Sequence, residues 1–282
     1  MRLKDLTDQW LIKTHFFGIY RKVDKDDDEW KAGEVCLANP KNPSERLPRS
    51  VINDAIEQAV ANLEDKILAR IKGNEHIVEH HDYDKDLFSQ FMFVPLREYP
   101  VRRVHSLKMV YGENGSVVWD VPPELIQAKL STDGIGSRFG YLQILPFYGI
   151  STSVGFDPAT FTLLQGTMVS PTAPSLIRAE YDAGMDLMEN DLPPAVVRAI
   201  GLIAAIHPLN IMGDIVIGAG IANVSMSFDG FSESIGTTAS AENSAYSSRI
   251  IMHRKELYGE QQQPGLLDTL KGKWRRTPLG IF

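Results

Sequence analysis

The sequence predicts an α+β protein, in which a helical bundle formed from both ends of the chain carries an inserted, mainly antiparallel β domain. Apolar residues recur at three- and four-residue steps over residues 48–72 and again from residue 192 onward, which is typical of helices with a buried face. Between these segments the period falls to about 2, the period of strands. With 282 residues, 43% of them hydrophobic, the chain can bury one large core or two smaller ones.

The first predicted helix runs from about Pro48 to Lys72. Pro48 is tolerated in a first turn, and Gly73 favours a left-handed end. The residues predicted to share its apolar stripe are Ile52, Ile56, Ala59, Val60, Leu63, Ile67 and Ile71.

The region from residue 74 to 190 is rich in β-branched and aromatic residues and is punctuated by Gly, Pro and Asn. The strands expected there are Leu87–Leu96, Val101–Tyr111, Val117–Val121, Tyr141–Leu145, Phe161–Val169 and Ser175–Asp182. Asn114-Gly115 and Asp133-Gly134 suit tight hairpin turns. In the last strand, Ile177, Ala179 and Tyr181 alternate with charged residues, which predicts one buried face.

Helical periodicity returns at Leu192-Pro193-Pro194, and Pro208 is expected to end this second helix. Its interior holds a single charge, Arg198, so partner helices must cover it. One is the helix at residues 48–72. The other is a third predicted helix over Thr238–Tyr258, in which Tyr246, Ile250 and Leu257 share a face.

Two further segments remain. Residues 213–235 combine glycines with alternating apolar residues, which fits a mobile loop, a hairpin, or a segment ordered only against a neighbour. Past Tyr258 the chain is poor in apolar residues and becomes basic around Trp274, which predicts a tail that needs a partner. The expected organisation is an N-terminal segment with the first helix (1–73), an inserted β domain (74–190), the remaining helices (191–260) and the tail (261–282).

Composition narrows the function classes. A formal charge of −7 argues against a protein that coats DNA. The single cysteine, Cys36, cannot form an internal disulfide, which fits a reducing compartment. No uninterrupted apolar run approaches the roughly 20 residues of a membrane span, so no membrane is expected. The acidic run Asp24–Glu29 is interpreted as a solvated loop, with a channel lining that repels DNA as the alternative.

Candidate chemistry is sparse. Residues 76–84 hold a cluster of metal-ligand types, namely His76, Glu79, His80, His81, Asp82 and Asp84. Metal sites usually draw on separate elements, so we favour a solvated or interface strand over a zinc site. Gly218-Ala219-Gly220 lacks the Lys-Ser/Thr ending of a phosphate loop. No hydrolase elbow or zinc-protease motif occurs. We predict a non-enzymatic protein with no catalytic residue, metal or cofactor.

Several short motifs, in order, suggest a family. They are Glu98-Tyr99-Pro100-Val101, Ile177–Gly184 with its Tyr-x-Ala-Gly ending, Asp191–Ile200 with Leu-Pro before a helix, Ser225–Ile235, and Ala245-Tyr246-Ser247. Over about residues 48 to 260 this order resembles the head-to-tail connector (adaptor) proteins of tailed bacteriophages. The long segment before residue 45 and the large β region depart from that pattern.

The resemblance implies a structural virion protein in the neck between head and tail, assembled in the host cytoplasm. It implies a homo-oligomeric ring, typically of about twelve subunits. The ring would sit beneath the portal protein, receive a tail terminator, stopper or other neck protein, and pass double-stranded DNA without specific binding. Connectors tend to grip the portal through the C-terminal segment. The matching portal-contact positions are Leu266, Leu267, Lys271, Lys273, Trp274 (as anchor), Arg275, Arg276 and Phe282. A disordered tail is the alternative.

Contact between subunits is expected at the glycine-flanked apolar segment. Ring closure would cover its apolar side chains, while packing within one subunit is the alternative. The expected inter-subunit residues are Ile215, Ile217, Ile221, Phe228 and Phe231.

Two rival functions stay open. One is a baseplate or tail-end structural subunit, which would assemble in the same way with another partner. The other is a carbohydrate-binding or hydrolytic β-sandwich module, in which aromatic rings would stack on sugars. Those rings are Trp30, Trp119, Tyr141, Phe147 and Tyr148.

Overall fold

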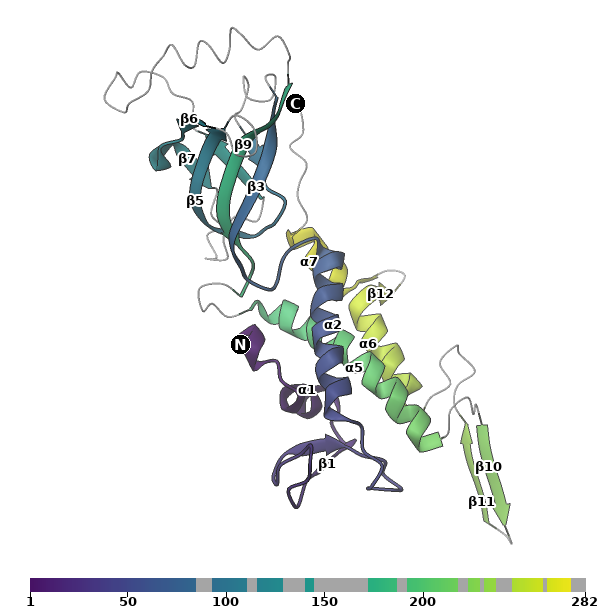
Figure 1. Ribbon diagram of the computed structural model, residues 1–282. Helices are drawn as coiled ribbons and strands as arrows, with labels where there is room; N and C mark the ends of the chain where they lie inside the picture. The colour runs from purple at the N-terminus through teal and green to yellow at the C-terminus, as the bar shows by residue number, and fades with distance from the viewer. Residues whose placement is uncertain are drawn as a thin grey trace. The chain divides into compact units, whose positions relative to one another are not determined.

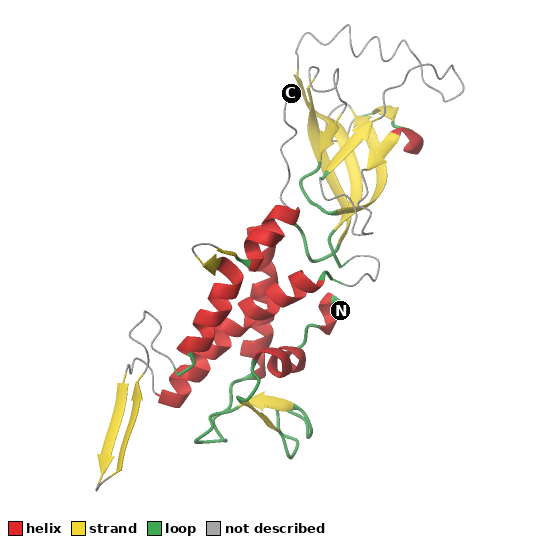
Figure 2. Ribbon diagram, turned by 180° about the vertical axis from the view of Figure 1, so that it is seen from behind, coloured by secondary structure: helices red, strands yellow, loops and turns green. Residues whose placement is uncertain are grey.

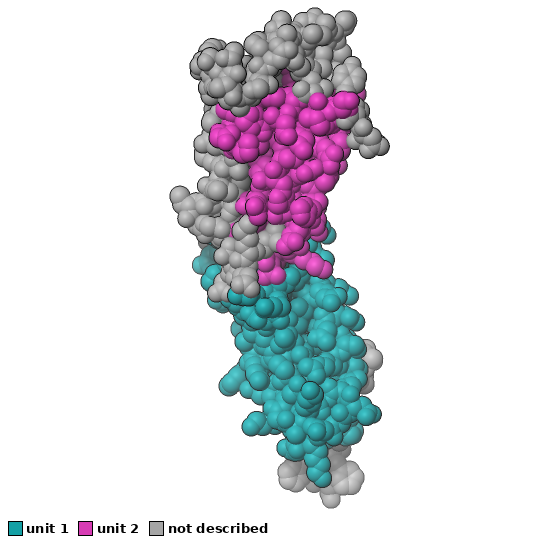
Figure 3. Space-filling model, turned by 60° about the vertical axis from the view of Figure 1, so that its left-hand side comes forward, with its two compact units in different colours: residues 1–68, 191–273 teal, residues 69–190, 274–282 magenta. Residues whose placement is uncertain are grey.

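The computed structural model describes residues 1–84, 93–110, 116–128, 140–144, 172–186, 192–217, 223–228, 231–236, 245–260 and 263–274. Over these residues it combines α-helices with antiparallel sheets, which confirms the α+β class (Figures 1 and 2). The chain divides into two compact units, shown in different colours in Figure 3. We call residues 1–68 and 191–273 the helical unit, and residues 69–190 and 274–282 the β unit.

The helices of the helical unit come from both parts of the chain that build it. They are the short η1 (Leu3–Asp5), α1 (Asp8–His15), α2 (Arg49–Ile67), α5 (Pro194–Ile217), α6 (Ser247–Tyr258) and α7 (Leu266–Trp274, whose last residue groups with the β unit). Three of them, α1, α2 and α6, pack against α5, so α5 is the central helix of this unit. The first helix, α1, was not predicted from the sequence.

The buried stripe of α2 follows the predicted pattern. Its buried residues are Ile52, Ala55, Ile56, Ala59, Val60, Leu63 and Ile67. The helix ends earlier than predicted, because Leu68 takes the left-handed conformation (φ 55°) expected of Gly73. Beyond it, the backbone N–H of Arg70 donates to the carbonyl of Tyr99 at 2.7 Å, so the chain already belongs to the β unit.

The predicted end of the second helix at Pro208 is wrong. α5 continues through Pro208 to Ile217. A proline removes one internal hydrogen bond, but Leu209 and Met212 beyond it are fully buried, and this packing maintains the helix.

α5 has the length and composition of a membrane span, although charged residues such as Arg198 and Asp214 interrupt its apolar sequence. Residues Pro194–Val216 are long and apolar enough to cross a membrane by length and composition, with a mean hydropathy of 1.7. However, 56% of this window is buried inside the chain, and α1, α2 and α6 pack against it. Packing of this kind is what a core helix requires.

Among the described residues, three small antiparallel hairpins complete the helical unit. They are β1 (Tyr20–Lys22) with β2 (Val35–Leu37), β10 (Asn223–Phe228) with β11 (Phe231–Gly236), and β12 (Gly259–Glu260) with β13 (Gln263–Pro264). Of the three possibilities left open for residues 213–235, the structure therefore shows a hairpin over residues 223–236. Cys36 on β2 is buried and unpaired, and burial raises the pKa of its thiol.

Over its described residues, the β unit contains two antiparallel sheets. The first has the order β3 (Asn74–Asp84), β9 (Thr172–Ala183), β5 (Val101–Val110), β6 (Val117–Asp120). The second has the order β4 (Phe93–Pro95), β8 (Tyr141–Ile144), β7 (Ile126–Ala128), and a short η2 (Pro123–Leu125) precedes β7. The predicted strands beginning at residues 101, 117 and 141 are confirmed, whereas Phe161–Val169 and both predicted hairpin turns lie outside the described residues.

The two sheets share one hydrophobic core. Ile177, Ala179 and Tyr181 of β9 are buried in it, as the alternation predicts. Leu107 of β5 and Leu142 of β8 join them, so residues far apart in sequence close the core. On the other face of β9, Arg178 and Glu180 are only half-buried.

Candidate functional site

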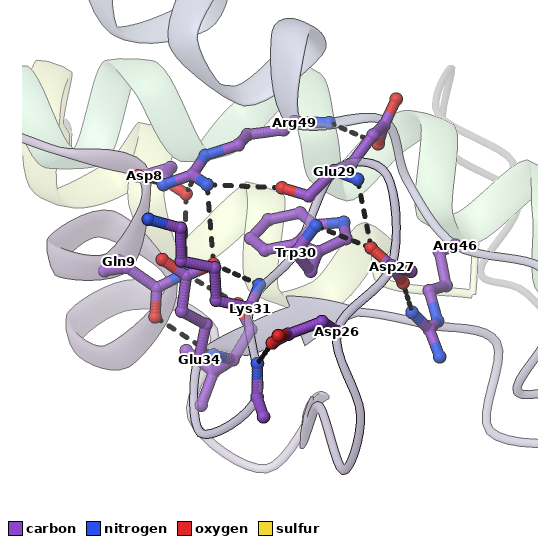
Figure 4. Close-up of polar contacts among 12 residues, drawn as sticks. Asp8, Gln9, Asp26, Asp27, Glu29, Trp30, Lys31, Glu34, Arg46 and Arg49 are labelled. Atoms are coloured by element: carbon purple, nitrogen blue, oxygen red, sulfur yellow. Dashed lines mark hydrogen bonds and ion pairs between the residues drawn. The ribbon is translucent and has the colours of Figure 1, made fainter.

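A polar network at the start of α2 holds residues 24–29, which we call the acidic loop (Figure 4). Arg49 is the first residue of α2, and its Nε lies 2.8 Å from Oδ2 of the buried Asp8. Its Nη1 donates to the carbonyl of Glu29 at 3.2 Å and lies 3.4 Å from a carboxylate oxygen of Glu34. The guanidinium also lies 5.3 Å from the ring centroid of the buried Trp30, a cation–π distance. Arg49 thus joins α1, α2 and the acidic loop.

The carboxylates of the loop also bind its own backbone. Asp27 accepts the backbone N–H of Trp30 at 2.6 Å and pairs with Arg46, while Asp26 accepts the N–H of Ala32 at 2.7 Å. The Trp30 N–H bond is the main reason that the pKa of Asp27 is lowered. All six residues from Asp24 to Glu29 are exposed, so the run is solvated, but its backbone is folded. Aspartates that bond to following N–H groups are the signal that indicates such a turn.

A second feature is a group of exposed or half-exposed side chains on α6 and on the segment after α1. Phe17 and Met252 are 76% and 67% exposed, which is unusual for large apolar residues. Arg249 Nη1 donates to the Phe17 carbonyl at 3.2 Å and so links the segment after α1 to α6. Lys255 is exposed one turn further along α6. We call Phe17, Arg249, Met252 and Lys255 the α6 patch; residues at i and i+3 share one side of a helix.

Two histidines meet between α1, α5 and α6. The ring of His15 occupies the space beside Gly201 of α5, where an added Cβ would lie only 2.2 Å from the ring. Oγ1 of Thr14 lies 2.7 Å from His15 Nδ1. The His253 ring of α6 stands edge-on to His15, with centroids 6.3 Å apart.

The surroundings of both histidines disfavour the charged form and lower the pKa of each ring. Burial is the largest cause, and it lowers the pKa of His15 from 6.5 to about 4, with His253 and Arg198 acting in the same direction and Glu256 opposing them. Burial and Arg249 likewise lower the pKa of His253. A protonated ring here would be poorly solvated and close to other positive charges.

The predicted cluster of residues 76–84 is dispersed by the structure. Glu79 is buried, and its Oε1 accepts the Tyr181 hydroxyl at 2.6 Å. Its Oε2 accepts the Arg97 backbone N–H at 3.0 Å and lies 3.0 Å from His81 Nε2. Burial raises the pKa of Glu79, but these hydrogen bonds outweigh it and lower the pKa overall. Burial and the Glu79 bond raise the pKa of Tyr181.

The other members of the cluster turn elsewhere. His76 donates its backbone N–H to Asp182 at 2.9 Å and stacks on His105, with centroids 4.8 Å apart. Asp82 accepts the Ser175 N–H at 2.8 Å. His80 and Asp84 pair with Arg178 and Thr172 of β9 in the strand register. Over the described residues, no group of three or more His, Cys, Asp or Glu side chains could hold a metal ion.

The expectation of a C-terminal tail without internal partners is wrong for residues 266–274. They form α7, and Leu267, Leu270 and Trp274 are buried. In this structure Trp274 is therefore not an exposed residue that could anchor the portal contact. Lys271 and Lys273 are exposed and Leu266 is half-buried, whereas Arg275, Arg276 and Phe282 lie outside the described residues.

The expected inter-subunit residues fall on three elements. Ile215 of α5 is half-buried, and its carbonyl accepts Asn39 Nδ2 at 3.3 Å. Ile217 ends α5, Phe228 ends β10 and Phe231 begins β11, so these positions flank or belong to the hairpin. Ile221 lies outside the described residues.

A scan against models of known protein families finds no matching family, and a search of curated proteins finds no match. The likeness to connector proteins therefore rests on the order of elements and the short motifs alone.

Proposed function

We propose that this chain is a non-enzymatic subunit of a tailed-phage particle, a head-to-tail connector that forms a ring beneath the portal and lets DNA pass. In this proposal the helices of both chain ends form one bundle, and residues 74–190 are a β domain inserted into it. The observation that carries the proposal is the helical unit itself, which combines residues 1–68 with 191–273. This is the arrangement that the connector-like order of motifs implies.

The polar contacts support a structural role rather than catalysis. Both carboxylate oxygens of the buried Glu79 are engaged by groups of the protein, and Asp8 is paired with Arg49. Buried polar groups satisfied in this way rigidify a fold. The sugar-binding alternative is weakened, because Trp30, one of its predicted aromatic residues, is only 2% exposed and cannot stack on a ligand.

The exposed side of α7 is the proposed portal contact. Lys271 and Lys273 are exposed there, and Arg275 and Arg276 follow in the sequence. A basic surface of this kind fits an acidic partner surface, because opposite charges speed encounter and fix orientation.

Electron microscopy and native mass measurement of the purified chain test the ring, and capture by portal protein tests the partner. We expect a closed ring with a central hole. The variant Lys271→Glu/Lys273→Glu should keep the ring but weaken portal capture at least about tenfold. Lys41→Glu, an exposed reversal on another loop, should leave capture unchanged.

Charge reversal is a better test than deletion of the tail, because deletion would expose the surface that Leu267 and Leu270 cover. A chain that stays monomeric at all concentrations would refute the connector proposal. A ring that does not bind portal protein but binds a baseplate protein would favour a tail-end subunit instead.

A further inference from the structure

The α6 patch is built like the centre of a protein interface. Phe17 and Met252 are both largely exposed, and Arg249, three residues before Met252 on α6, donates a hydrogen bond to the Phe17 carbonyl. Aromatic residues, Met and Arg are enriched in interface cores. Large exposed apolar side chains on two neighbouring segments, here α6 and the segment after α1, indicate a surface that another molecule covers.

The patch is also positively charged. The Arg249–Phe17 hydrogen bond links the segment after α1 to α6. Lys255 pairs with Glu260 at 2.8 Å, but both side chains are more than half exposed. Exposed pairs of this kind contribute little, so Lys255 can exchange Glu260 for another carboxylate.

The acidic loop presents the opposite charge. Asp24 and Asp28 are exposed, and neither has a partner among the contacts that the structure describes. Their neighbours Asp26 and Asp27 accept hydrogen bonds from backbone N–H groups that follow them, and the side chain of Trp30 is buried. The loop therefore presents unpaired carboxylates on a fixed backbone.

The two surfaces lie at opposite ends of α1. Asp8, its first residue, binds Arg49 beside the acidic loop. Phe17, two residues after its last residue, belongs to the α6 patch. Two complementary surfaces at different places on one subunit fit a head-to-tail contact, which generates rings when the rotation closes.

We propose that the α6 patch of one copy docks on the acidic loop of a second copy of this chain. A second copy of the chain is the expected partner because the two surfaces carry opposite charges and each copy carries both of them. The inference rests on the proposed ring and assigns the surfaces that build it.

A charge exchange between the two surfaces tests the contact in the full-length protein. Met252→Glu/Lys255→Glu makes the patch acidic, and Asp24→Lys/Asp28→Lys makes the loop basic. Each variant alone should weaken self-association at least about tenfold, because like charges then face each other. Mixing the two variants, or combining all four changes in one chain, should restore assembly. Lys41→Glu and Glu57→Lys, exposed reversals outside both surfaces, should assemble like the original chain.

The outcomes separate this inference from the ring itself. If the original chain forms rings and both surface variants do so equally well, the contact is wrong and the connector proposal stands. If each variant loses self-association and mixing the two variants does not restore it, the two surfaces do not meet, which also overturns the contact. A patch variant that still forms rings but no longer binds portal or tail protein assigns the patch to that partner instead. An original chain that never associates overturns both proposals. Circular dichroism of each variant checks that it is folded.

Discussion

His15 shows how a single side chain can make the helical unit sensitive to pH. Its ring fills the space left by the missing side chain of Gly201 and stands beside His253. The charged groups that face it from α5 and α6 are Arg198 and Glu256. The buried position favours the neutral ring, which sets the sign of the pH dependence.

We predict that the helical unit loses stability as the pH falls below about 6.5. The pKa of His15 is lowered from 6.5 to about 4 in the folded chain. Between these values the unfolded chain binds a proton that the folded chain does not, so the free energy of unfolding decreases with falling pH. From pH 7 to pH 5 the loss due to His15 should be about 2 kcal/mol. Urea unfolding at both pH values measures it.

His15→Phe, which keeps a ring but cannot be protonated, should reduce this pH dependence by that amount. His207→Gln, a substitution at an exposed position of α5, should leave it unchanged. If His15→Phe and the original chain lose stability equally between pH 7 and pH 5, the ring of His15 is not the group that titrates.

At the scale of elements, the connection between α6 and α7 depends on two glycines. Gly259 has a φ of 79°, and a Cβ on Gly265 would lie 2.4 Å from both the Gly259 nitrogen and the Leu257 carbonyl oxygen. The backbones touch at this point, so any side chain would force them apart. This approach positions α7, the helix of the proposed portal contact.

We predict that Gly265→Ala lowers the free energy of unfolding by roughly 2 kcal/mol, because the clash is with backbone atoms that cannot turn aside. The matched control is Gly272→Ala. Gly272 lies in α7 with nothing within 4 Å of an added Cβ, so alanine should stabilise the helix slightly. Thermal melting of both variants compares them. If Gly265→Ala melts at the same temperature as the original chain, the turn between α6 and α7 can accept a side chain without loss of stability.

Elements with a complete local pattern were predictable from the sequence. The stripe of α2 and the alternation of β9 are examples, because each buries one regular face. The continuation of α5 beyond Pro208 was not, since packing by other helices outweighs one lost hydrogen bond. α7 was missed although Leu267, Leu270 and Trp274 follow helical spacing, because a nine-residue helix with few apolar residues gives only a weak periodic signal.

The candidate surfaces were harder to predict than the elements. The α6 patch joins Phe17 to a helix more than 230 positions later in the chain, and no local pattern reports such a meeting. The acidic run was predicted to be solvated, but its folded backbone depends on Trp30 and Arg49. The histidine-rich strand shows the converse, because its ligand-like spacing is dispersed by the register with β9.

At the scale of the whole molecule, the division into two units makes a prediction about cooperativity. The helical unit has a core that includes Leu63 of α2, which is fully buried, and the β unit has a core that includes Leu107 of β5, which is 1% exposed. If each core stabilises its own unit, calorimetry of the full-length chain should resolve two unfolding transitions.

Matched leucine-to-alanine substitutions assign each transition to its unit. Leu63→Ala and Leu107→Ala each remove a similar buried side chain, which typically costs about 2 to 5 kcal/mol. We expect Leu63→Ala to lower one transition by on the order of 10 °C and leave the other in place, and Leu107→Ala to do the reverse. A single transition that both substitutions lower alike would mean that the units unfold as one, and the β region would then be an integral part of the helical core rather than an insertion.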